Sequence, residues 1–439
     1  MGSTRTDGKK PVGYFELVRT NRNFRSLWTG QVVSLLGDWF NLIASAALIS
    51  HLTRSGLAVG SLFVVRMLAP FLVSPLAGVL ADRYNRKLLL IVADIFRGII
   101  VLGFLFVTTP EQAWLLYVLS AIQLAFSGVF FPARNSIIPD IVSRTELGAA
   151  NAISTTTWSV MLSLGAAIGG IVAGQWGIYP AFVVDSLSFF FSAFFISRVH
   201  YTHQPAHAEE TENEMHILAI AYHQYVDGLK YLKDHRDTFF ITLHKSSMSL
   251  LANGALQVLM VPLAQQVFVI GESGGTSLGL LYAIAGVGTG IGPILARVFT
   301  GDRDRALRIA LAVSYAVSVV GLAITAPLAS FALVLLGTLI RSLGGGINWT
   351  FSTQLLLTSV PDKVRGRVFS SEFAMFTLSS AIGSAAGGWL FDNTSLGIGG
   401  IIWWMTALFV IPGILWFLWI QFGKPRSDPS HEDHLAPTS

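Results

Sequence analysis

Cysteine is absent from this chain of 439 residues. Its absence excludes a disulfide framework, a thiolate metal site and a catalytic cysteine. Charge is scarce too: Asp, Glu, Lys and Arg make up 12% of the residues, whereas soluble domains usually carry about 25%. Hydrophobic residues reach 52%, so few polar side chains remain to cover a surface that faces water. The composition indicates an integral membrane protein.

Sequence motifs of several enzyme classes are missing as well. The chain has neither a Gly-x-x-x-x-Gly-Lys-Ser/Thr phosphate loop nor a His-Glu-x-x-His zinc motif, so ATP is not the expected energy source. The Gly-x-Ser-x-Gly match at 271–275 lies between two apolar runs, not between a strand and a helix, and we interpret it as chance. A basic patch typical of nucleic-acid binding is also missing. We expect no enzyme activity, no cofactor, no metal and no nucleic-acid partner.

Long apolar runs dominate what is present. A spanning helix needs roughly 20 apolar residues, and twelve runs reach that length. They lie near 26–50, 57–81, 88–108, 112–136, 147–174, 178–198, 238–267, 277–300, 307–326, 328–358, 367–391 and 396–422. The first run is too long for a cleaved signal peptide and follows a polar, basic segment, so we expect it to stay. The predicted fold class is an all-α membrane protein with twelve transmembrane helices.

Lysine and arginine indicate the orientation. With the N-terminus in the cytoplasm, most of the 29 Lys and Arg fall in cytoplasmic segments, and the outer loops hold only Arg54. Cytoplasmic loops of membrane proteins carry this kind of excess. We therefore predict that both termini are cytoplasmic.

The longest polar stretch divides the chain into two sets of six helices. We predict a cytoplasmic N-terminal segment (1–25), a six-helix bundle (26–198), a cytoplasmic linker with a surface helix (199–237), a second six-helix bundle (238–422) and a cytoplasmic tail (423–439). The surface helix is expected near His216 to Leu232, where the linker becomes amphipathic.

The two bundles repeat each other. Ile138-Pro139-Asp140 and Val360-Pro361-Asp362 stand before the fifth helix of each half, and those helices carry similar Gly/Ala runs at 165–170 and 383–388. Internal repeats of this kind are common in transporter folds, and small residues four apart let helices approach closely.

The loop after the second run carries the most specific motif. It reads Gly78-Val79-Leu80-Ala81-Asp82-Arg83-Tyr84-Asn85-Arg86-Lys87. This resembles the loop signature of the major facilitator superfamily, with Asn85 where Gly is usual. Asn tolerates a left-handed backbone better than most residues, so we expect such a turn there.

Further stretches resemble the branch that contains bacterial macrolide-efflux proteins and enterobactin exporters, which are drug:proton antiporters. They are Asn21 to Trp28, Gln31, Leu36 to Trp39, Arg66 to Pro70, Ala93 to Arg97, Phe131 to Arg134 and Pro139-Asp140. The resemblance implies two bundles related by a pseudo-two-fold axis that work by alternating access.

The resemblance also implies a cytoplasmic latch. Asp82 would face the start of the eleventh helix, where free amides, the helix dipole and two arginines attract an anion. The residues of this predicted latch are Gly78, Asp82, Arg83, Arg86, Lys87, Arg365 and Arg367. An alternative for the basic residues alone is that they only set the topology.

Charged residues inside the spans are candidates for function, because a charge at mid-membrane costs roughly 3 kcal/mol. The acids are Asp38, Asp94, Asp185 and Glu372, and the bases are Arg66, Arg97, Lys245 and Arg341. Asp94 and Arg97 are three apart on one helix face, so we predict that they pair. The dipole of the eleventh helix explains Glu372 near its start.

Asp38 is the leading candidate for proton coupling. It lies near the middle of the first helix, and in the resembled fold the first helices line the cavity. A carboxylate there can bind a proton and a cationic substrate in turn. The alternative is a fixed ion pair with Arg66 or Arg341; Arg341 could instead face an anionic substrate.

Uncharged polar residues within the spans are candidates for contacts with a substrate, although such residues more often form a bond between helices. They are Gln31, Asn41, Gln123, Asn253, Gln257 and Asn348. The run Phe189 to Phe191 is expected to face lipid or the protein core, and an aromatic substrate cavity is the alternative.

The sequence as a whole predicts a secondary transporter of the bacterial plasma (inner) membrane. We expect a monomer that exports amphipathic small molecules, such as drugs, macrolide-like compounds or siderophores, driven by the proton gradient. Its partners would be that substrate and the lipid bilayer. The alternatives are a lipid or metabolite carrier or a facilitator of the same fold and, in another class, a membrane scaffold or receptor that does not transport.

Overall fold

The computed structural model describes residues 13–143, 145–201, 226–301 and 303–422. Within these residues the chain is helical and contains no strand. The first twelve residues, the tail from 423 onward and most of the predicted linker lie outside the described residues. Of the predicted surface helix near 216–232, the described part from Val226 onward is helical.

Twelve helical segments of the described chain are long and apolar enough to cross a membrane, which confirms the predicted fold class. A short helix, α1 (Tyr14–Thr20), precedes the first. The first six spans are built from α2 (Arg22–Thr53), α3 (Gly56–Arg83), α4 (Arg86–Leu102), α5 (Ala113–Ile141), α6 (Leu147–Trp176) and α7 (Ile178–Ser197). The next six are built from α9 (Arg236–Met248) with α10 (Ala255–Pro262), then α11 (Gly275–Thr300), α12 (Asp304–Thr325), α13 (Phe331–Ser359), α14 (Asp362–Asn393) and α15 (Gly397–Phe422).

Local chemistry accounts for several helix ends. Gly177, with a φ of 92°, separates α6 from α7 in a conformation that residues with a Cβ rarely adopt. Ser330 caps α13 by accepting a hydrogen bond from the Leu333 amide. Asn85 caps α4 in the same way through the Leu88 amide, with φ −60° and ψ 110°. The left-handed turn predicted at Asn85 is therefore wrong, because the residue acts as an extended helix cap.

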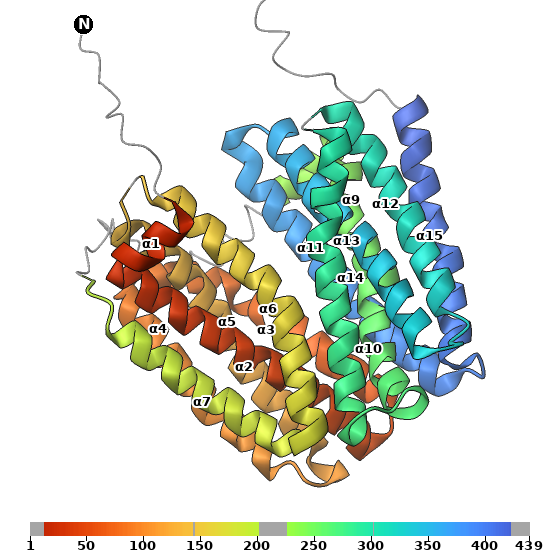
Figure 1. Ribbon diagram of the computed structural model, residues 1–439. Helices are drawn as coiled ribbons and strands as arrows, with labels where there is room; N and C mark the ends of the chain where they lie inside the picture. Colours follow the sequence, from red (N-terminus) through yellow and green to blue (C-terminus); the bar gives the residue numbers. More distant parts are fainter. Residues whose placement is uncertain (1–12, 144, 202–225, 302, 423–439) are drawn as a thin grey trace, which may run out of the picture. The chain divides into compact units, whose positions relative to one another are not determined.

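The described helices group into two compact units. The first contains Met1–Leu52, Ala69–Glu212 and Ile270–Gly279, and the second contains Thr53–Leu68, Asn213–Val269 and Leu280–Ser439. The first part of α3 thus packs in the second unit, and the segment that leads into α11 packs in the first (Figure 1).

The repeated glycine motif allows close helix crossings in each unit. In the first unit Gly170 of α6 lies against Gly279 of α11, so closely that a Cβ on either residue would clash with the other backbone. In the second unit Gly388 of α14 lies against the backbone of Gly56 in α3 in the same manner. The repeat seen in the sequence therefore corresponds to a repeated packing role.

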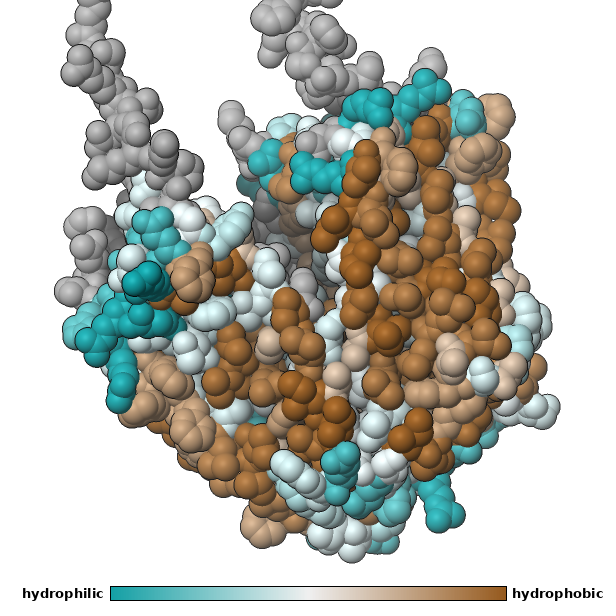
Figure 2. Space-filling view, viewed as in Figure 1, coloured by the Kyte–Doolittle hydropathy of each residue, from teal (hydrophilic) through white to brown (hydrophobic). Residues whose placement is uncertain are grey.

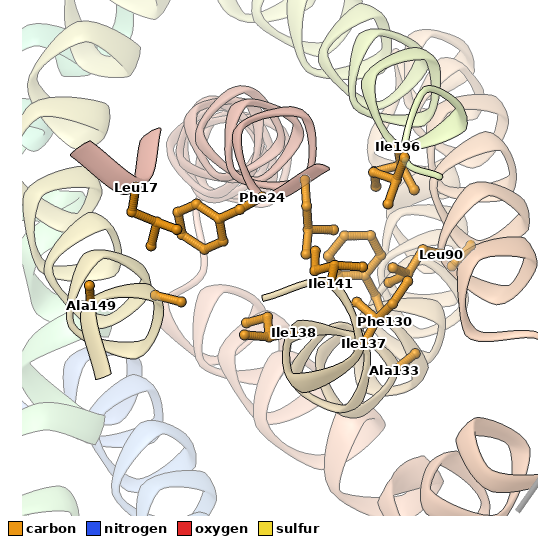
Figure 3. Packing of buried hydrophobic residues seen from close by; sticks show 14 residues of the cluster. Leu17, Phe24, Leu90, Phe130, Ala133, Ile137, Ile138, Ile141, Ala149 and Ile196 are labelled. Carbon is orange, nitrogen blue, oxygen red and sulfur yellow. The ribbon is translucent and has the colours of Figure 1, made fainter. Parts of the chain in front are cut away.

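Apolar side chains fill each unit and cover its outer helix faces. In the first unit one core cluster gathers side chains from α1, α2, α4, α5, α6 and α7, with Phe24, Leu90 and Phe130 among them (Figure 3). Hydrophobic side chains also cover the helix faces in the space-filling view, while hydrophilic ones gather at the helix ends (Figure 2). Such a surface is suited to a bilayer, where apolar faces meet lipid and polar ends meet water.

Candidate functional site

Arg97 of α4 is the centre of a buried charge cluster in the first unit. Its Nη1 donates a hydrogen bond of 3.2 Å to Asp94 Oδ1, three residues earlier on the same helix. The predicted pairing of Asp94 with Arg97 is thus confirmed. The side chain of Asp94 has no exposure, and that of Arg97 is 3% exposed. The pair therefore lies where water cannot screen it.

Asp38 of α2 is the second acid of the cluster. Arg97 Nη2 lies 2.7 Å from Asp38 Oδ1 and 2.9 Å from Oδ2, so one nitrogen donates to both oxygens of the carboxylate. The Asp38 side chain is 28% exposed, far more than Asp94. One guanidinium thus connects a buried carboxylate with a partly exposed one.

The helix α7 supplies the third acid and an aromatic face, and it runs beside α4 (Figure 1). Asp185 is buried, and its charge acts on Arg97. The Arg97 guanidinium lies 3.9 Å from the centre of the Phe189 ring, at a distance typical of a cation–π interaction. Of the two positions predicted for this phenylalanine, the structure shows the protein core.

A glycine next to Asp38 makes this arrangement possible. A Cβ at Gly37 would clash with Ser188 Oγ and would lie 2.5 Å from Asp185 Oδ1. Only glycine therefore lets α2 approach α7 closely enough to bring Asp38 and Asp185 into one cluster.

The cluster contains more acids than bases. Asp38 and Asp94 both bond the guanidinium of Arg97, and the charge of Asp185 also acts on it. Asp94 Oδ2 is buried and has no hydrogen-bond partner among the described residues. Burying an uncompensated carboxylate is costly unless a cation or a proton neutralises it. This arrangement can hold a proton, and the proton could enter at the exposed side, through Asp38.

The predicted ion pair of Asp38 with Arg66 or Arg341 stays a prediction. Asp38 pairs with Arg97 because α4 places that guanidinium against α2. Arg66 and Arg341 belong to the second unit, where the charges of both act on the Tyr282 hydroxyl. Arg341 donates 3.2 Å hydrogen bonds to Asn253 Oδ1 and Ser342 Oγ.

Glu372 also has a different role from the one predicted. The helix α14 begins at Asp362, before the predicted start at 367, so Glu372 is in its third turn, beyond the reach of the helix N-terminus. Its Oε1 lies 3.0 Å from Nζ of Lys245 on α9, and both side chains are buried. The buried charge of Glu372 is therefore balanced by an ion pair between two helices, and the explanation by the helix dipole was wrong.

Three of the six uncharged polar candidates have side-chain hydrogen bonds within the protein. Gln31 Nε2 donates to the Ser154 carbonyl of α6 at 3.5 Å, and Asn41 Oδ1 accepts from Ser45 one turn later. Asn253 bonds Arg341. Gln123 and Asn348 are buried. For Gln31, Asn41 and Asn253, bonds within the helix bundle are what the structure shows, and a contact with substrate stays a prediction.

Two arginines of the predicted latch have partners inside their own units. Arg86 donates to Asp140 Oδ2 at 2.8 Å and to the Ser136 carbonyl at 3.0 Å. Arg367 pairs with Asp227 at 3.3 Å.

Two of the other latch residues, Arg365 and Lys87, lie near helix ends. Arg365 donates to carbonyls at the end of α13, and Lys87 is half-buried beside the cap of α4. The surroundings of Gly78, Asp82 and Arg83 lie outside the described part of the chain. The latch stays a prediction.

Sequence reasoning missed the central position of Arg97. It assigned Arg97 to Asp94 alone, although Asp38 and Asp185 also lie within spans of the same bundle. A possible signal was Phe189, whose spacing of four from Asp185 places both on one face of α7. The pair Lys245–Glu372 was missed because each residue was considered alone.

Comparison with known proteins identifies the family. The model of the Major Facilitator Superfamily matches residues 27–371 and 246–438. The uncharacterized MFS-type transporter YfiS of Bacillus subtilis (strain 168) is 27% identical over 421 residues, covering 90% of this chain and 94% of the relative. The putative bacilysin exporter BacE of the same organism is 26% identical over 364 residues, covering 82% of this chain and 87% of the relative.

Solved structures agree with this fold. A peptide transporter POT in complex with sulfate has a TM-score of 0.71 at 12% identity and covers 94% of this chain and 96% of its own. An inward-facing bacterial homologue of the lysosomal transporter Spinster has a TM-score of 0.70 at 14% identity and covers 94% and 99%. With most of the chain matched by the family model and a transporter fold in the structure, the chain belongs to the Major Facilitator Superfamily.

Proposed function

We propose that this transporter is a proton-coupled exporter of amphipathic small molecules, and that Asp38, Asp94, Asp185 and Arg97 form its coupling site. The observation that carries the proposal is the excess of carboxylates over bases around Arg97. A buried group of this kind exchanges protons because the neutral acid avoids the cost of an unpaired buried charge.

The geometry indicates how protonation of one acid would change the forces between helices. Asp38 is partly exposed and shares the guanidinium with fully buried Asp94. A proton on Asp38 weakens its attraction for Arg97, which then turns toward Asp94 and Asp185. Because the three acids lie on α2, α4 and α7, this shift changes the forces between three helices. A helix rearrangement of that kind is how alternating access is coupled to an ion.

Export rather than import is favoured by the relatives. BacE is named as a putative bacilysin exporter, and a 29% identical stretch of 177 residues relates the chain to MdtG of Serratia proteamaculans (strain 568), a multidrug resistance protein. That stretch covers 39% of this chain and 42% of MdtG. The remaining possibilities are a lipid or metabolite carrier and a facilitator. In a facilitator no proton would move with the substrate. A bacterial inner membrane location belongs to the same proposal.

Proton binding can be measured without knowing the substrate. We would record infrared spectra of the purified protein between acid and alkaline pH and follow the carbonyl stretch of protonated carboxyl groups. The wild type should show a titrating band that is reduced in Asp38→Asn and in Asp94→Asn. A spectrum that is the same in wild type and both variants would overturn the proposed site.

Proton movement is then tested in everted vesicles with a ligand chosen by thermal-shift screening of drugs, siderophores and lysolipids. The proposal predicts that addition of this ligand lets protons cross the membrane and so reduces an imposed pH gradient. A ligand that crosses without any proton movement would identify a facilitator instead.

A further inference from the structure

We infer that Glu372, Trp349 and Phe369 form a binding site for an organic ammonium group in the second unit, and that Lys245 fills this site in the substrate-free protein. The inference extends the proposed function, on which its role in transport rests, because it assigns the substrate a positive charge on nitrogen. The site contains no residue of the coupling cluster, which belongs to the first unit.

The four side chains meet where α9 packs against α13 and α14. Lys245 Nζ is 3.0 Å from Glu372 Oε1, and the two side chains are 6% and 3% exposed. The same nitrogen lies 4.6 Å from the centre of the Trp349 ring and 5.9 Å from that of Phe369. A carboxylate and two aromatic rings thus surround one ammonium group.

This combination is how proteins recognise ammonium ligands. Aromatic faces attract a cation within about 6 Å of the ring centre, and tryptophan attracts it most strongly. The carboxylate supplies the opposite charge. On α14, Phe369, Glu372 and Phe376 are spaced three and four residues apart, so the three share one helix face. The centre of the Phe376 ring lies 5.2 Å from the centre of the Trp349 ring. Aromatic surface therefore continues beyond the Glu372 carboxylate. The apolar part of an amphipathic cation could pack against it.

Lys245 is held in a way that allows exchange. Lysine is a compact charge on a flexible stem, without the two-pronged geometry of arginine. Lys245 Nζ meets Glu372 Oε1 at 3.0 Å, and this one contact lacks the second parallel bond that a guanidinium would add.

A second buried pair of the same unit shows the contrast. Arg308 bonds Asp237 through two parallel hydrogen bonds of 2.7 Å each and bonds Asp304 through Nε at 2.7 Å. Trp419 Nε1 also donates to Asp237. Three hydrogen bonds thus fix Arg308 to Asp237 and Asp304, whereas Lys245 and Glu372 meet through a single Nζ–Oε1 contact.

The test removes the internal cation and offers an external one. Lys245→Met leaves the carboxylate and both rings, and choline supplies a quaternary ammonium. The neutral control ligand is 3,3-dimethylbutan-1-ol, which has the shape of choline with carbon in place of the charged nitrogen. Binding is measured in detergent by the shift of Tm with ligand concentration and needs no proton gradient.

We expect choline to raise the Tm of Lys245→Met in a saturable way, with a Kd at least tenfold lower than for the wild type, where Lys245 competes. The neutral alcohol should leave Tm unchanged. The double variant Lys245→Met/Glu372→Gln should lose the response to choline, and Trp349→Leu in the Lys245→Met background should weaken it. Arg308→Met, the matched variant of the fixed pair, should gain no response.

Equal responses to choline in Lys245→Met and in the double variant, or no gain over the wild type, would overturn the inference. If Lys245→Met does not fold, Lys245→Gln keeps a polar group in the site and is judged by the same outcomes. Because the measurement involves no transport, a failure of proton coupling at Asp38 would leave its result unchanged, and the two proposals can fail separately.

Discussion

The two units carry their buried charges in different proportions. In the first unit three carboxylates share Arg97. In the second unit Lys245 and Glu372 are matched one to one, and the hydrogen bonds of Arg341 go to the neutral side chains of Asn253 and Ser342. Among these described clusters, an excess of buried negative charge is therefore a property of the first unit.

The two units share their helix packing but not their buried charged residues. Gly170 and Gly388 occupy equivalent places in the repeat and allow equivalent close crossings, so the two halves share their packing. The charged residues do not follow the repeat in the same way. Three acids lie on α2, α4 and α7 near one arginine, whereas the second unit pairs Lys245 with Glu372. Another buried base of the second unit, Arg308, bonds Asp237 and the exposed Asp304. A duplicated fold therefore supports a proton site in one unit and a separate cation site in the other.

Removing the shared base should have the largest effect. Arg97→Met removes the cation that bonds both Asp38 and Asp94, and we expect it to lower the free energy of unfolding by about 3–5 kcal/mol. Denaturation at neutral pH measures the loss. Adding Asp94→Asn should restore only part of it, because Asp38 and Asp185 remain. A variant as stable as the wild type would contradict the charge imbalance.

The matched pair should behave differently when both partners are removed. Lys245→Met or Glu372→Gln alone leaves one buried charge unpaired and should cost up to about 3–5 kcal/mol. The double variant leaves no charge and should be more stable than either single variant. A double-mutant cycle on Tm and unfolding free energy gives the coupling. Additive losses would show that the two residues do not interact.

The approach of α2 to α7 should be sensitive to one methyl group. Gly37→Ala places a Cβ against Ser188 Oγ and Asp185 Oδ1, and such overpacking costs about 1–3 kcal/mol. Gly148→Ala, in the same unit, is the control because its Cβ would meet no atom within 4 Å. Thermal unfolding should separate the two variants, and equal stability would mean that α2 and α7 adjust freely.

The smallest effect is expected at the exposed pair of the first unit. Arg86 and Asp140 have side chains that are 20% and 38% exposed, so water screens their attraction. Arg86→Met should change the free energy of unfolding by about 0–1 kcal/mol. A loss as large as that of Arg97→Met would mean that burial is not what distinguishes the two arginines.

The spans were predictable because each is a long apolar run, and length and hydropathy are properties of the sequence alone. The pairing of Asp94 with Arg97 was predictable for a similar reason, since both residues lie on one helix. The partner of Asp38 was not, because it depends on which helices are neighbours. The sequence offered four bases within spans and no rule for choosing Arg97.

Two smaller errors have the same origin. Glu372 was assigned to a helix start because the apolar run begins near 367, whereas the polar residues from Asp362 onward extend α14 by more than a turn. Asn85 was assigned a left-handed turn through a family signature, whereas α4 uses its side chain as a cap. In both cases the helix boundary, which hydropathy locates poorly, decided the role of the residue.

The most direct test of the coupling site compares two modes of transport in Asp38→Asn, reconstituted in liposomes with the ligand found by thermal-shift screening. Downhill exchange of that ligand needs only alternating access, whereas uphill export also needs a proton to be taken up and released. We predict that Asp38→Asn retains ligand binding and downhill exchange and loses uphill export, while Gly148→Ala, whose added Cβ would meet no atom within 4 Å, retains all three. Full uphill export by Asp38→Asn would contradict the account and remove Asp38 from the mechanism.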